Sequence, residues 1–206
     1  VLLVFLAALA AGSAWASGRA RRATVVTAPL ARLACLSAVT HLGAMAAVNV
    51  WPAWYWRLFN AWHPETLVGI VTINATAVFA ILAVPFLLAG TIFPLTLTGA
   101  RNAGPGATAR AVGLLYAVNT AGAILGAVLA GFVMVPWIGS HATLMCVTLL
   151  MAILAVGCAL VSGNRRLAGG TFAGLAVVAA GLAAGPKWDQ KTLNAAIYEP
   201  QPGIDP

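Results

Sequence analysis

Hydrophobic residues run along the chain in long stretches with few charges, and polar residues gather between them. A window of about 19 residues with few or no charged side chains is typical of a membrane-spanning helix. Six stretches meet this condition, at residues 1–17, 33–51, 67–92, 111–135, 142–162 and 167–185. The pattern predicts an all-α fold, a polytopic integral membrane helix bundle of about six transmembrane helices over residues 1–185. Residues 186–206 are predicted to form an extramembrane tail or the start of a soluble domain.

The two outermost stretches leave alternatives open. The first ends in Ala14-Trp15-Ala16, which also fits the cleavage site of a signal peptide, but the arginines that follow favour a stop-transfer anchor. Since the sequence starts at Val1 and not at a methionine, we expect the natural chain to extend further. The last stretch is rich in Gly and Ala, so it is either a marginal span or a helix buried within the bundle.

One charge-free run exceeds the thickness of a bilayer. It extends from Thr66 to Thr98, which would be about 50 Å of helix, against a hydrocarbon core of about 30 Å. A proline inside a helix removes a hydrogen-bond donor and clashes with the preceding turn. We therefore expect a kink near Pro85 and an exit from the membrane around Pro94.

Composition and charge support a membrane protein and predict its orientation. Of the 206 residues, 62% are hydrophobic and only 7% are charged, and the mean hydropathy is +0.95. If the spans alternate, eight of the eleven basic residues fall on one side, which the positive-inside rule predicts to be cytoplasmic. The net charge of +7 then reflects topology and contact with membrane lipids, not nucleic-acid binding. We expect a multi-pass protein of the bacterial inner (cytoplasmic) membrane.

Few side chains within the predicted spans could carry chemistry. His41 is the only ionisable side chain besides cysteine that lies well inside a span, and without an acidic partner it is predicted to be a hydrogen-bonded packing residue before a functional one. Asn74 and Asn119 could form hydrogen bonds across helices or line a substrate cavity, and Tyr116 lies near Asn119. The sequence predicts no catalytic residue, no metal ligand and no cofactor in this chain.

Two patterns predict contacts with lipid and with other helices. Four tryptophans between residues 51 and 65 are predicted to form an interfacial aromatic belt on the outer side, with an aromatic binding box as the alternative. They are Trp51, Trp54, Trp56 and Trp62. Small residues recur about every four positions within 109–139, a spacing that lets two helices pack closely. These predicted packing residues are Gly113, Ala117, Gly122, Gly126 and Ala130.

Two separated motifs carry a family resemblance. The first spans a G-x-x-F-P helix end, an L-Y-x-x-N-T-x-G-A-x-x-G helix start and a G-F-x-x-x-P-x-x-G turn. Its residues are Gly90, Phe93, Pro94, Leu115, Tyr116, Asn119, Thr120, Gly122, Ala123, Gly126, Gly131, Phe132, Pro136 and Gly139. The second motif is Trp188-Asp189 followed by Tyr198. Together they resemble the transmembrane half of bacterial fused multi-pass spermidine-synthase-like (polyamine aminopropyltransferase-like) membrane proteins.

The resemblance implies a function for a longer relative. The soluble domain of that family has a Rossmann-like methyltransferase fold with a G-G-G-x-G loop, which this sequence lacks, so no catalytic or cofactor-binding residue is carried over. We expect a non-catalytic anchor or scaffold within a larger membrane assembly, with other membrane subunits or a C-terminal soluble domain as partners. The alternatives are a small-molecule transporter, of polyamines for example, and the membrane part of a fused aminopropyltransferase.

Overall fold

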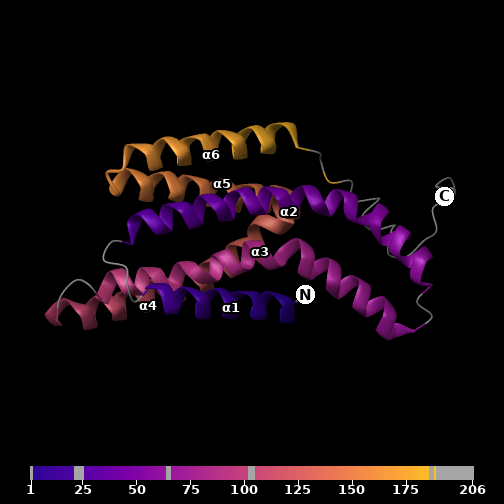
Figure 1. Cartoon of the computed structure of the whole chain (residues 1–206), viewed down its shortest axis with the longest axis horizontal. Coiled ribbons are helices and arrows are strands. Elements are labelled where there is room, and N and C mark those ends of the chain that lie inside the picture. The colour runs from indigo at the N-terminus through magenta and orange to yellow at the C-terminus, as the bar shows by residue number, and fades with distance from the viewer. Residues whose placement is uncertain (1, 21–25, 64–65, 102–104, 186–187, 189–206) are drawn as a thin grey trace.

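The computed structural model describes residues 2–20, 26–63, 66–101, 105–185 and 188 (Figure 1). The helices are α1 (Leu2–Ala20), α2 (Thr27–Trp62), α3 (Leu67–Arg101), α4 (Pro105–Val128), the π-helix η1 (Leu129–Met134), α5 (Val135–Val161) and α6 (Arg165–Ala184). The prediction of an all-α fold is thus confirmed for the described residues. Of the predicted tail, only Trp188 is described.

The number of spans differs from the predicted six. Four helical segments are long and apolar enough to cross a membrane: Thr27–Trp62, Leu67–Arg101, Ala109–Val161 and Arg165–Ala184. The apolar part of α1, Leu3–Gly18, is shorter than 18 residues, and the predicted spans 111–135 and 142–162 belong to one continuous segment. The Gly- and Ala-rich last stretch does have the length and composition of a span.

The segment Ala109–Val161 bends sharply, and its two halves meet at a kink. As a straight helix its 53 residues would measure about 80 Å, far more than a bilayer core. Pro136 cannot donate a backbone hydrogen bond to the turn that precedes it, and η1 forms there. Gly139 then leaves the helical region, with φ 81° and ψ 163°. The start of α4 and the end of α5 consequently lie at the same end of the molecule (Figure 1).

Helices α2 and α3 are longer than predicted because they continue through prolines. Helix α3 contains both Pro85 and Pro94 and continues past the predicted span to Arg101. Figure 1 shows α3 bending midway along its length. The aromatic segment after residue 51 likewise belongs to α2, which includes Pro52 and ends at Trp62. The helix ends there because His63 adopts the left-handed conformation, with φ 42°.

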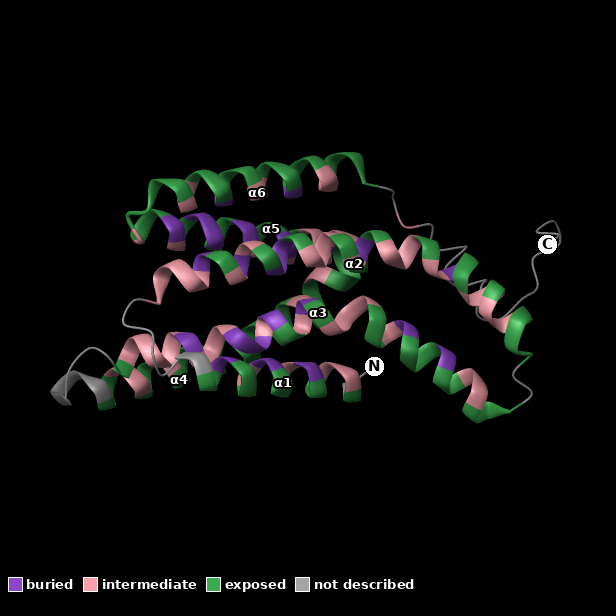
Figure 2. Ribbon diagram, in the orientation of Figure 1, coloured by how far each residue is buried: buried purple, intermediate pink, exposed green. Residues whose placement is uncertain are grey.

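Small residues bring the helices together. α2 lies at the centre and contacts α3, α5 and α6, while α1 packs along α3 (Figure 1). Where α2, α5 and α6 meet, Ala38, Ala152 and Val178 form a buried cluster. In Figure 2 the buried residues lie on the faces that meet neighbouring helices, and the outer face of α6 is exposed. Short side chains let helix backbones approach closely where lipid supplies no hydrophobic driving force.

The interface between α1 and α3 depends on two glycines. A Cβ atom added at Gly12 would overlap the backbone of Leu87, and one added at Gly90 would overlap the backbone of Leu9. The Ser13 hydroxyl donates a hydrogen bond of 3.2 Å to the carbonyl oxygen of Gly90. This glycine pair was not among the predicted packing residues.

Candidate functional site

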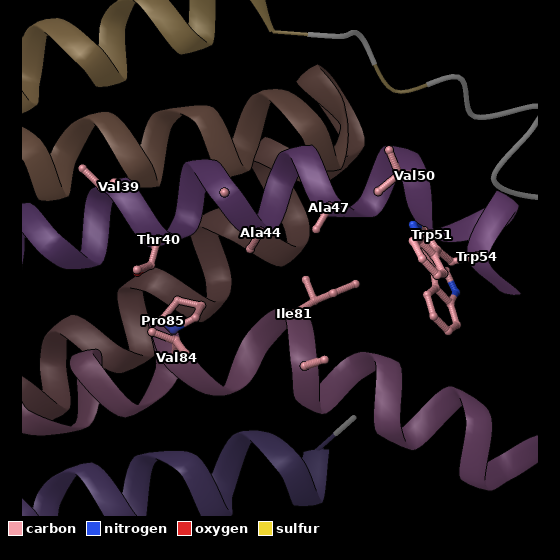
Figure 3. A pocket seen from close by; sticks show the side chains of 12 residues that line it. Val39, Thr40, Ala44, Ala47, Val50, Trp51, Trp54, Ile81, Val84 and Pro85 are labelled. Carbon is pink, nitrogen blue, oxygen red and sulfur yellow. The ribbon is translucent and has the colours of Figure 1, made fainter. Parts of the chain in front are cut away.

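A groove lies between α2 and α3 and could hold a ligand (Figure 3). Its volume is about 610 Å³, within the range of about 300–1,000 Å³ that is typical of ligand sites. The lining residues are Val39, Thr40, Gly43, Ala44, Ala47, Val50, Trp51, Trp54, Ala80, Ile81, Val84 and Pro85.

The groove results from small residues on one helix and a proline on the other. Gly43 and Ala47, one turn apart on α2, leave the space that longer side chains would fill. On α3, the buried Pro85 cannot donate to Ile81, the residue one turn earlier, and its ring crowds that carbonyl. Figure 3 shows Ile81 and Pro85 beside the bend of α3, facing Ala47 and its neighbours on α2.

The lining offers almost no polar group to a ligand. Its one hydroxyl belongs to Thr40, which donates a hydrogen bond of 3.0 Å to the carbonyl oxygen of Ser37 in its own helix. The remaining lining is aliphatic or aromatic, apart from the indole nitrogens of the two tryptophans. Such a surface suits a hydrocarbon ligand, since it leaves a polar ligand without partners.

Two of the four predicted aromatic residues lie at the groove, and two do not. Trp51 and Trp54 line it (Figure 3). Trp56 instead packs edge-on against Phe59, with ring centroids 6.0 Å apart, and Trp62 is 67% exposed. The structure thus brings no box of four tryptophans together.

An arginine covers one of the aromatic faces that an amine would use. The guanidinium carbon of Arg57 lies 5.6 Å from the centroid of the Trp54 ring. A cation over a tryptophan face is attracted by the ring electrons, so this face is already occupied. The tryptophans therefore do not form an open cage for a cationic ligand.

A smaller cavity of about 240 Å³ lies among α2, α5 and α6, and sequence reasoning missed it. His141, Asn49 and Met45 are among its lining residues. The ring of Trp188 packs edge-on against His141 at 5.1 Å, and its Nε1 donates a hydrogen bond of 3.2 Å to the carbonyl oxygen of Met45. His141 was missed because residues 136–141 were predicted to be a turn outside the spans.

The predicted polar residues bond within their own helices. His41 Nδ1 lies 2.7 Å from the Ser37 carbonyl oxygen, as expected for a hydrogen-bonded packing residue. Asn74 is exposed and donates a 2.9 Å hydrogen bond to the carbonyl oxygen of Ile70, so this bond stays within α3. The two side chains lie on different helices and neither lines the groove.

The glycines of the predicted packing face on α4 contact no other helix of the described chain. A Cβ added at Gly113, Gly122 or Gly126 would have no atom within 4 Å. Ala117 and Asn119 are exposed, and Ala130 is half-buried. Tyr116 is 50% exposed and makes an edge-on contact with Phe93 of α3, at 5.0 Å between ring centroids.

The fold and the apolar helices define a polytopic α-helical membrane protein. In the described part of the chain, no group of three or more His, Cys, Asp or Glu side chains could hold a metal ion. No protein-family model, no curated protein and no solved structure matches the chain.

Proposed function

We propose that this protein is a non-catalytic membrane subunit that packs through α4 and η1 into a larger assembly of the bacterial inner membrane. The observation that carries the proposal is the exposure of this helix. Every residue from Gly113 to Leu129 is exposed except Leu115, although the stretch contains the regular Gly and Ala spacing that lets membrane helices pack closely.

A comparison within the molecule supports this use of the face. At Gly12 and Gly90 a neighbouring backbone occupies the space that a Cβ would take. At Gly122 and Gly126 the same space is open, and a second backbone would fit there. A helix that packs only against lipid gains nothing from glycine, which costs about 1 kcal/mol relative to alanine in a helix interior. A partner helix on α4 would offset that cost through close packing.

The proposed orientation places the basic end of the bundle in the cytoplasm. Arg101 ends α3 and Arg165 and Arg166 begin α6, and these helix ends lie together at one end of the molecule (Figure 1). The positive-inside rule favours this end as the cytoplasmic one. The resemblance to the membrane half of spermidine-synthase-like proteins agrees with an anchoring role and remains a prediction.

Native mass spectrometry of the protein extracted from its membrane in mild detergent tests the proposal. We expect wild-type protein to be extracted in a complex, and a Gly122→Leu/Gly126→Leu variant to be extracted as a free 21.0 kDa chain. Gly157→Leu on α5 is the matched control, because an added Cβ there also has no atom within 4 Å. Recovery of the wild type only as a single 21.0 kDa chain would contradict the proposal.

A further inference from the structure

We propose that the groove between α2 and α3 binds one acyl chain of a phospholipid and that Arg57 binds its phosphate. This site is separate from the assembly face of α4. The groove has an apolar floor, an open side and a cation next to its aromatic end.

The open side of the groove faces the surroundings of the bundle. Val50, Trp54 and Val84 on its rim are 54%, 53% and 53% exposed, respectively. Since α2 and α3 have the length and composition of spans, their exposed apolar surface meets bilayer hydrocarbon. An acyl chain can therefore enter sideways from the bilayer.

Water is a poor alternative occupant of this groove. A buried water molecule needs two to four polar partners, and apolar cavities stay dry. The Thr40 hydroxyl already donates to Ser37, so it offers at most an acceptor. Hydrocarbon fills the apolar space and leaves the hydrogen bond from Thr40 to Ser37 intact.

The position of Arg57 selects a phospholipid over a neutral hydrocarbon. Arg57 lies three residues after Trp54 on α2, and its guanidinium lies over that ring. Tryptophan prefers the headgroup level of a membrane, so the same level holds the arginine. The described part of the chain contains no Asp or Glu to pair with it. A lipid phosphate matches the guanidinium fork, which binds phosphate oxygens through two parallel hydrogen bonds.

The test measures binding of phosphatidylglycerol to the whole chain in mild detergent by native mass spectrometry. Gly43→Phe fills the groove, and its Cβ has room, since no atom lies within 4 Å. We expect this variant to bind long-chain phosphatidylglycerol about tenfold or more weakly than the wild type, while the matched control Gly157→Phe changes binding less than about twofold. Circular dichroism verifies that both variants keep their helix content.

The phosphate contact is tested separately. Arg57→Gln should weaken binding about three- to tenfold, as expected for loss of a charge-assisted hydrogen bond, and Arg57→Lys should lose less. Arg32→Gln, at an exposed position near the other end of α2, should have no effect on binding.

Two outcomes would overturn the proposal. Equal binding of phosphatidylglycerol by the Gly43→Phe and Gly157→Phe variants would show that the lipid is ordinary annular lipid. Short-chain phosphatidylglycerol binding as tightly as the long-chain form would also overturn it, since no acyl chain would then be held.

Discussion

A single methyl group added at Gly12 tests the close packing of α1 against α3. In the native structure the Leu87 backbone occupies the position that the alanine Cβ would take. A backbone cannot move aside as the end of a flexible side chain can, so Gly12→Ala has to push the two helices apart. Overpacking of this kind typically costs about 1–3 kcal/mol.

Separating the helices would also weaken neighbouring contacts. The hydrogen bond from Ser13 to the Gly90 carbonyl, 3.2 Å long, contributes about 0.5–1.5 kcal/mol. The edge-on contact between Phe5 and Phe86, at 4.7 Å, contributes about 0.5–1.5 kcal/mol beyond the area that it buries. With partial loss of both, we expect Gly12→Ala to lower the free energy of unfolding by about 2–4 kcal/mol.

Gly18→Ala on the same helix is the matched control. An added Cβ at Gly18 has no atom within 4 Å, so the change should raise helix propensity and stabilise by up to about 1 kcal/mol. Unfolding by sodium dodecyl sulfate in mixed micelles, followed by circular dichroism, measures both variants. If Gly12→Ala were no more destabilising than Gly18→Ala, the close approach of α1 and α3 would be refuted.

Three further substitutions test other features of the fold. Gly139→Ala places a side chain at φ 81° and should destabilise by about 1–2 kcal/mol in the same unfolding assay, while Gly157→Ala should not. Trp188→Phe keeps an aromatic ring beside His141 but removes the hydrogen bond to Met45, and should cost about 0.5–1.5 kcal/mol; no loss of stability would mean that this bond contributes nothing. Pro85→Ala restores the backbone donor and should straighten α3, lengthening the distance between spin labels near its two ends by electron paramagnetic resonance; an unchanged distance would assign the bend to packing alone.

The hydrophobic pattern predicted the helices well but not their ends. Low charge and long apolar runs identify helices because a helix satisfies the hydrogen bonds of its own backbone groups, which find no water inside a bilayer. The pattern placed the ends of two apolar stretches at residues 51 and 92, where polar, aromatic or proline residues follow, although both helices continue beyond these positions. Helix α3 contacts α1, α2 and α4, and these tertiary contacts are not visible in the local sequence.

Glycine spacing did not predict which face each helix buries. Gly122 and Gly126 have the stronger pattern, yet they face open space, while Gly12 and Gly90 contact a neighbouring helix. In a soluble protein the buried face would be more apolar than the exposed one. In a membrane, lipid and helix neighbours have similar polarity, so the sequence pattern does not distinguish the two environments.

The α2–α3 groove shows what information a prediction of a binding groove from sequence would need. Both contributions were visible in the sequence, as the small residues Gly43 and Ala47 and as Pro85 within an apolar run. They form a groove only because α2 and α3 pack in the register that places them opposite each other. That register follows from side-chain packing along the whole α2–α3 interface, including residues far from the groove. A shift of one helical turn, about 5.4 Å, would bring different side chains opposite Gly43 and change the shape of the groove without altering a single helix.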